Sequence, residues 1–254
     1  MGLFSTVKHD ILAFIARCNG NGVIAEDFEA RDVAVERVNA ISIQGPWRVE
    51  ILPPTGANRG RIVIERRFLD RVDFRYGNET VNLSMLEVIG FWPKVMPRLE
   101  LYLNELPESL VLMDNSEIKI SSPMTGDFLQ LEARGQAQVD LGDIQLKNLN
   151  LNLALHSECR CGGKINCVKA KITHQGKCEF SGWAEDLSAE MSGRSVFNVT
   201  QAENSAFNLA DAAEASIIST QKMAVSARGC AKISYCGMPE ITRNISEYAQ
   251  VIPR

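Results

Sequence analysis

From about residue 40 onward, apolar and polar residues alternate along the chain with a period of two. The alternation is clearest in residues 41–43, 62–64, 99–103, 118–120 and 149–155. Such a pattern places one set of side chains in an interior and the other set in water, as in a β-strand that is buried on one face. Because no long helical pattern separates these segments, the sequence argues against a doubly wound α/β sheet.

The strand-like segments return at a nearly constant spacing. Successive inward pairs begin 16 to 21 residues apart, at Ile41/Ile43, Ile62/Ile64, Val81/Leu83, Leu99/Leu101, Ile118/Ile120, Val139/Leu141, Cys159/Cys161, Cys178/Phe180, Val196/Asn198, Ala215/Ile217 and Ala231/Ile233. Strands of a β-sandwich return about every 8–12 residues. A repeat near 20 residues instead predicts a β-solenoid, in which coils stacked about 4.8 Å apart bury one continuous interior.

Glycines recur a few residues before several of the later pairs, at Gly135, Gly176, Gly193 and Gly229. Since glycine adopts positive φ without a steric penalty, these positions are predicted to form a corner of each coil.

Residues 1–25 have a different pattern. Apolar residues at positions 4, 7, 11, 14 and 15 follow helical spacing. We predict an amphipathic helix and a glycine turn over residues 1–25, followed by one β-helix over residues 26–254. The apolar run in residues 11–16 is too short for a secretion signal, and Asp10 lies directly against it.

Residues 20–25 match the pattern G-x-G-x-x-A of dinucleotide-binding turns. That chemistry needs an acidic residue at the end of a second strand about 20 residues later. The next strand-like run ends at Gln44, without an acid. The sequence therefore predicts no dinucleotide, and no other cofactor is expected.

Composition limits the classes of partner. The 254-residue chain has a formal net charge of −4, which argues against a nucleic-acid partner. No stretch approaches the ~18 apolar residues that a transmembrane segment requires.

Three segments, taken in order, carry a family resemblance. They are Phe28 with residues 39–49 and 61–65, then residues 190–196, and finally residues 226–241, which end in a pattern close to Y-x-G-x-P. Over about residues 28–254 the chain resembles the head GIN domain family of bacterial auto-transporter adhesins. The resemblance implies a right-handed parallel β-helix without established catalytic residues. It also implies a non-enzymatic binding or scaffold module that presents a rigid face to a protein or glycan partner.

The compartment and two other functions stay open at this stage. The resemblance implies a cell-envelope or secreted location, whereas free cysteines and the missing export signal favour the cytoplasm. One alternative function is a β-helix enzyme that acts on a polysaccharide. The other is an intracellular solenoid that assembles into homo-oligomers through its open ends.

Seven cysteines are present, at positions 18, 159, 161, 167, 178, 230 and 236. Burial as free thiols on adjacent coils is the favoured interpretation of Cys159, Cys161 and Cys178. These three are also weak candidates for a metal site, because the spacing C-x-C-x5-C differs from that of a zinc knuckle. A disulfide from Cys159 to Cys178 is a further alternative, since neighbouring coils bring Cα atoms within bonding range.

Acidic residues and one tryptophan in the later coils form the candidate partner face. They are Trp183, Glu185, Asp186, Asp211 and Glu214. Acidic clusters on an exposed strand face bind or cleave polysaccharides in many β-helix proteins, and a tryptophan can stack on a sugar. Carboxylates spread over different faces would argue against the enzyme.

Overall fold

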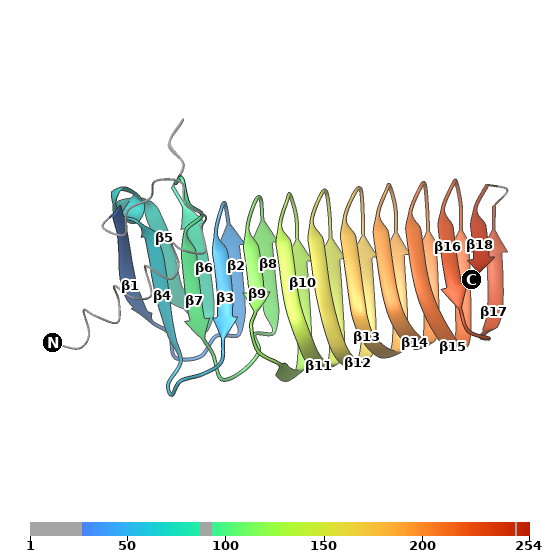
Figure 1. The fold of residues 1–254 in the computed structure, drawn as a ribbon, viewed down its shortest axis with the longest axis horizontal. Helices are drawn as coiled ribbons and strands as arrows, with labels where there is room; N and C mark the ends of the chain where they lie inside the picture. The colour runs from blue at the N-terminus through green and yellow to red at the C-terminus, as the bar shows by residue number, and fades with distance from the viewer. Residues whose placement is uncertain (1–26, 87–92, 247) are drawn as a thin grey trace.

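The computed structural model describes residues 27–86, 93–246 and 248–254. They form one 18-stranded sheet that winds into a parallel β-solenoid of about 8 turns (Figure 1). The all-β solenoid predicted from the sequence is confirmed. The helix predicted for residues 1–25 lies outside the described residues. In the described part of the chain, no helix has the length and apolar character needed to cross a membrane.

Two walls of strands enclose the interior. The first wall contains, in spatial order, β1 (Phe28–Ala34), β4 (Arg59–Glu65), β7 (Arg98–Tyr102), β3 (Arg48–Leu52), β9 (Glu117–Ile120), the first halves of β11 (Gln138–Leu153), β12 (Glu158–Ile172), β13 (Lys177–Met191), β14 (Val196–Leu209) and β15 (Glu214–Ala227), then β16 (Lys232–Cys236) and β18 (Gln250–Pro253).

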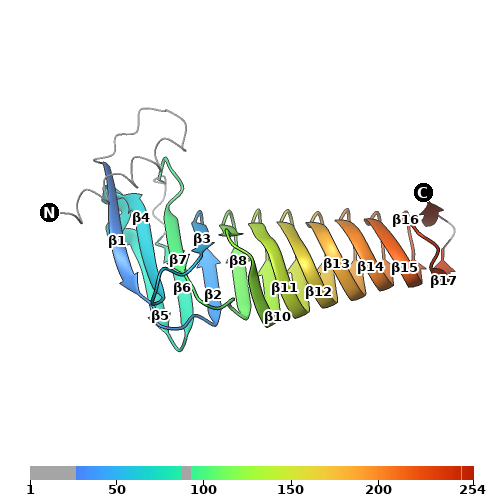
Figure 2. The same cartoon turned by 60° about the horizontal axis from the view of Figure 1, so that its bottom comes forward.

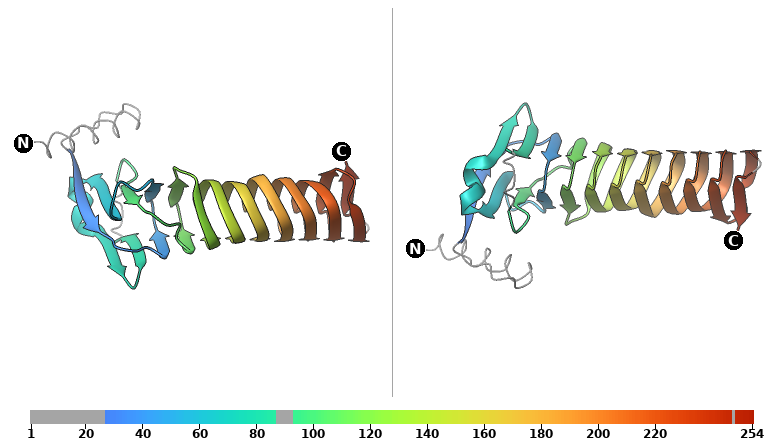
Figure 3. Two further views of the ribbon diagram at one scale, coloured as in Figure 1. Left: turned by 90° about the horizontal axis from the view of Figure 1, so that it is seen from below. Right: turned by 90° about the horizontal axis from the view of Figure 1, so that it is seen from above.

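The second wall faces the first across the core. It contains, in spatial order, β5 (Val72–Gly77), β6 (Thr80–Met85), β2 (Ala40–Gln44), β8 (Ser109–Met113), β10 (Met124–Ala133), the second halves of β11–β15, and β17 (Glu240–Ile245). A 3-10 helix, η2 (Arg66–Arg71), follows β4. Views from below and from above show the coils as one straight stack (Figure 3).

The alternation of apolar and polar residues explains how one strand serves both walls. In β13, Cys178 and Phe180 point inward from the first wall, and Leu187, Ala189 and Met191 point inward from the second. The alternation breaks in residues 181–186, where the strand bends from one wall to the other. Each coil therefore buries two apolar faces and leaves its polar side chains in water.

Inward residues stack in register from coil to coil. Val139, Cys159, Cys178, Phe197 and Ala215 are direct neighbours on successive coils of the first wall. All five are buried. The predicted coil length and the inward positions of Val139, Cys159 and Cys178 are therefore confirmed.

A tight turn leads from the second wall back to the first. One residue of this turn has positive φ in each coil: Asp114, Gly135, Leu155, His174, Gly193, Asp211 and Gly229. Three of the four predicted corner glycines occupy this position. Gly176 does not; it lies in a column of small buried residues with Ser157 and Ser195, and a Cβ at Gly176 would approach Ile172 to 3.0 Å.

The N-terminal part departs from the predicted order of coils. β2 lies between β6 and β8, and β3 lies between β7 and β9, so the chain inserts later strands on both sides of an early coil. Ile62 and Ile64 were expected to begin a coil, but they lie in β4, which runs antiparallel to both β1 and β7. These antiparallel strands cover one end of the stack (Figure 2).

One of the later inward pairs was wrong, and another, Ala231/Ile233, is buried as expected but out of register. Phe197 and Val199 point inward in β14, one residue beyond the expected pair Val196/Asn198. Ile233 aligns with Ala215, so the expected first member, Ala231, belongs to the preceding turn.

At the other end of the stack, β17 pairs with β15 and β18 pairs with β16. In the part of the chain that the structure describes, the outer edges of β17 and β18 have no partner strand. Self-association through an end of the solenoid stays a prediction.

Candidate functional site

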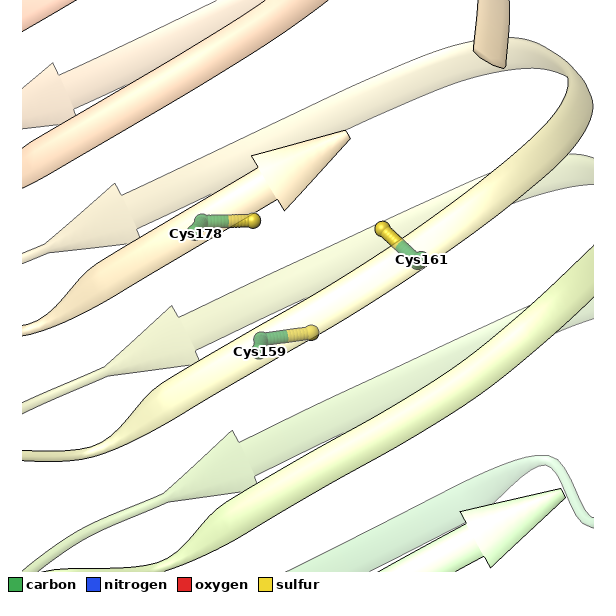
Figure 4. A group of neighbouring side chains, drawn as sticks. All are labelled: Cys159, Cys161 and Cys178. Atoms are coloured by element: carbon green, nitrogen blue, oxygen red, sulfur yellow. The ribbon is translucent and has the colours of Figure 1, made fainter. Parts of the chain in front are cut away.

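Three cysteine side chains converge inside the solenoid. Cys159 and Cys161 lie two residues apart on β12 and therefore point to the same side, and Cys178 lies directly opposite Cys159 on β13. Their sulfur atoms all lie within 4.8 Å of one another, and each residue is only 2–3% exposed. Figure 4 shows the Cys161 side chain directed toward the other two. We call these three residues the thiol cluster.

Coil stacking, rather than a metal-binding loop, builds the thiol cluster. Within the described residues it is the only group in which three His, Cys, Asp or Glu side chains come together closely enough to hold a metal ion. The described cysteines are all free thiols: Cys159, Cys161, Cys167, Cys178, Cys230 and Cys236. Cys159 and Cys178 therefore stand side by side without a disulfide.

Hydrogen bonds among the three thiols shift their pKa values in opposite directions. The bond with Cys161, followed by burial, raises the pKa of Cys159 well above its usual value, and the bond with Cys178 partly offsets this rise. Bonds with Cys159 and Cys161, and burial, likewise raise the pKa of Cys178. The same two neighbours donate to the sulfur of Cys161 and lower its pKa.

The five residues of the predicted partner face lie at different parts of the coil. Trp183 and Glu185 lie where β13 bends between the walls, and Asp186 begins the second-wall half of that strand. Asp211 lies in the turn between β14 and β15, whereas Glu214 begins β15 on the first wall. The structure thus brings Trp183, Glu185 and Asp186 to one region of β13 and places Asp211 and Glu214 elsewhere.

Several of these side chains already have partners within the chain. The ammonium of Lys164 lies 5.0 Å from the centre of the Trp183 ring. Asn204 donates a hydrogen bond of 3.0 Å to the Asp186 carboxylate. The backbone N–H of Gly193 donates one of 3.0 Å to Asp211, which ties this carboxylate to the neighbouring turn.

A shallow groove of about 420 Å³ runs over the outside of the second wall. Its floor is a stripe of short side chains stacked in register on four successive coils: Ser188, Ala206, Ala224 and Thr242. One border is a parallel column of longer polar side chains: Asp186, Asn204, Lys222 and Glu240. We call this feature the second-wall groove.

A second concavity, of about 370 Å³, lies over the first wall and is lined by charged residues that pair with one another. Arg48 contacts Glu117 at 2.7 Å, and Arg98 contacts Glu100 at 3.1 Å and also bonds to Glu50. Several of the charges over this surface are therefore already paired within the chain.

A family model described as "Putative auto-transporter adhesin, head GIN domain" matches residues 37–200. This match covers more than half of the chain. The chain belongs to the head GIN domain family. The resemblance inferred from the sequence is confirmed.

Solved structures share the fold of this head GIN domain at low sequence identity. A putative lipid binding protein from Parabacteroides distasonis ATCC 8503 superposes with a TM-score of 0.77 at 19% identity, covering 92% of this chain and 98% of its own. A putative adhesin from Parabacteroides merdae ATCC 43184 superposes with a TM-score of 0.76 at 14% identity, covering 92% of this chain and 98% of its own. Another putative adhesin, from Parabacteroides distasonis ATCC 8503, superposes with a TM-score of 0.78 at 12% identity, covering 89% of this chain and 96% of its own.

No curated protein sequence matches this head GIN domain. The coil register continues beyond residue 200 through β15, β16 and β18. The solenoid of this head GIN domain therefore extends past the segment that the family model matches.

The sequence did not single out the stripe of the second-wall groove. Its members are outward neighbours of inward residues such as Ala189 and Phe207, and they recur every 18 residues from Ser188 to Thr242. The available signal was a run of unusually short side chains at one outward position of the repeat.

Proposed function

We propose that this head GIN domain is a non-enzymatic binding module that holds an extended polar partner, a protein or a glycan, in the second-wall groove. The observation that carries the proposal is the in-register stripe of short side chains bordered by carboxylate, amide and ammonium groups. A regular array of hydrogen-bonding groups at the coil spacing suits a partner that is itself linear.

The binding surface belongs outside the solenoid, because buried apolar side chains from both walls pack into one continuous core. The similar structures, a putative lipid binding protein and two putative adhesins, are also described as binding proteins. The border of carboxylate, amide and ammonium groups along the groove favours a polar polymer over an acyl chain.

The arrangement of carboxylates favours binding over polysaccharide cleavage. Glycosidases place two carboxyl groups about 5–10 Å apart on either side of the scissile bond. In the second-wall groove, Asp186 and Glu240 are three coils apart, roughly 14 Å at the usual strand spacing. Asp186 is also engaged by Asn204. Asp211 and Glu214 lie outside this groove.

The proposal predicts that filling the groove weakens binding without unfolding the protein. In the double variant A206R/A224R, two exposed alanines on the groove floor become long, charged side chains. We expect binding to weaken at least about 10-fold, or 1.4 kcal/mol. The measurement is binding to a printed panel of linear polysaccharides and extracellular-matrix proteins, which also separates the glycan from the protein partner.

The matched control is Ala212→Arg, the same substitution at an exposed alanine in the turn between β14 and β15. This variant should bind as the unmodified chain does. The proposal fails if no member of the panel binds, or if A206R/A224R and A212R bind equally well.

A further inference from the structure

We propose that Cys159, Cys161 and Cys178 form a binding site for one Cu(I) ion inside the solenoid. This inference is independent of the second-wall groove, because the thiol cluster lies in the core and the groove lies on the outer surface.

The positions of the sulfur atoms suit a shared ion. At a metal–sulfur distance of about 2.3 Å, three sulfurs in a plane around an ion would lie about 4.0 Å apart. The three sulfurs lie within 4.8 Å of one another before any ion is bound. Small rotations about the Cα–Cβ bonds would therefore close the site, while the ladder between β12 and β13 holds the backbone in place.

The number and type of donors favour Cu(I). Thiolates select soft ions such as Cu(I), Zn²⁺ and iron–sulfur clusters. Structural zinc takes four ligands, and iron–sulfur clusters are held by four cysteines. Within the described residues, no fourth His, Cys, Asp or Glu joins the thiol cluster. Cu(I) is satisfied by two or three sulfur ligands.

The surroundings also suit a soft ion that is held by sulfur alone. The cluster residues stack directly on Val139, Phe180 and Phe197. These neighbours are 0–3% exposed, so water is excluded as an additional ligand. Each cysteine that binds the ion does so as a thiolate whose proton passes to solvent, and the single positive charge of Cu(I) offsets one of these negative charges. The copper stays Cu(I) throughout, so no electron is transferred.

The test is an anaerobic titration of the reduced 254-residue chain with Cu(I), in competition with the chromophoric chelator bicinchoninate. We expect one Cu(I) per chain to be withdrawn from the chelator. The background variant C18S/C167S/C230S/C236S removes every cysteine outside the thiol cluster and should bind one Cu(I) with unchanged affinity. In that background, Cys161→Val should weaken Cu(I) binding by at least about 100-fold. Loss of a residue that only supports a ligand typically weakens metal binding by about 10–100-fold, so a larger effect indicates a direct ligand.

Two further variants separate the loss of a ligand from a loss of folding. Cys159→Ala and Cys178→Ala each remove one sulfur, and alanine is already accepted at the equivalent inward position Ala215. Each variant should keep the β-sheet circular dichroism of the parent and lose the tight Cu(I).

Three results would overturn the proposal. The first is retention of tight Cu(I) binding in every folded single variant. The second is a Zn²⁺ affinity, measured by chelator competition on the same chain, that exceeds the affinity for Cu(I). The third is a disulfide within the thiol cluster of air-equilibrated protein, shown by mass spectrometry, together with no binding of Cu(I) after reduction.

Discussion

Replacing Gly163 with alanine is expected to destabilise the solenoid by more than about 4 kcal/mol, an exceptional effect for one methyl group. Gly163 has a φ of +98°, and an added Cβ would lie 2.1 Å from the carbonyl oxygen of Ile144 on the preceding coil. The obstructing atom belongs to the backbone, so the clash is relieved only if β11 and β12 separate. The free energy of unfolding in denaturant measures the loss.

Two other glycines provide matched controls for this substitution. Gly56 has a φ of +127°, but nothing lies within 4 Å of an added Cβ. Gly56→Ala should therefore show only backbone strain, about 1–2 kcal/mol. Gly77 has neither positive φ nor a close neighbour, so Gly77→Ala should change stability little. Equal losses in the Gly163 and Gly56 variants would contradict the close stacking of coils at Gly163.

Truncation of Phe197 to alanine is expected to lower the free energy of unfolding by about 3–5 kcal/mol. Phe197 is 0% exposed and stacks between Cys178 and Ala215, two much smaller residues. Neither neighbour can fill the space that the ring would leave. Denaturant unfolding compared with that of Thr200→Ala, a substitution at an exposed position of the same strand, isolates the effect of the cavity.

A double variant tests whether positions 197 and 215 are true neighbours. Ala215→Phe alone should overpack the core and destabilise it by about 1–3 kcal/mol. Combined with F197A, it moves the ring by one coil within the same column. We expect the double variant to be more stable than the sum of the single effects predicts, by about 0.5–3 kcal/mol. Strict additivity would show that the two side chains do not share one interior space.

The later coils could be predicted from the sequence because alternation and spacing agree there. Val139, Cys159 and Cys178 each lie between polar neighbours, so only one face of the strand can be buried. At residues 196–199 the adjacent residues Val196 and Phe197 are both apolar, so apolar side chains lie on both faces of the strand. A shift of one residue exchanges the two faces, and the alternation alone could not decide between them.

The N-terminal order could not be predicted in the same way. The apolar pattern of residues 59–65 shows that this segment is a half-buried strand, but alternation carries no information on which strand lies beside it or in which direction it runs. Ile41 has neighbours 40 and 69 residues away, Val81 and Leu110. Such pairing depends on the assembled fold, which a local period near 20 does not encode.

One candidate site could be predicted from the sequence, and the other could not. The spacing of 19 residues, close to one coil, predicted that Cys159 and Cys178 are neighbours on adjacent coils. Their place in the alternation of apolar and polar residues predicted that both point inward. Asp186 was expected to share one exposed strand face with Asp211 and Glu214, yet a bend and a turn of the coil separate these residues. The second-wall groove depends on the sizes of outward side chains over four coils, a property that composition does not reveal.

Both candidate sites depend on coils that stack in parallel and in register, and a cysteine cross-link tests this stacking directly. Glu179 and Asn198 are exposed partners on adjacent strands of the first wall. Strand spacing of about 4.8 Å lies within the Cα range of a disulfide. In the C18S/C167S/C230S/C236S background, the pair E179C/N198C should form a disulfide with diamide, detected by mass spectrometry.

The control pair E179C/N208C joins the first wall to the second and should stay reduced under the same conditions. The stacked coils predict rapid cross-linking in E179C/N198C and none in E179C/N208C. Failure of that pair to cross-link, or equal rates for the two pairs, would contradict the solenoid and the placement of both candidate sites.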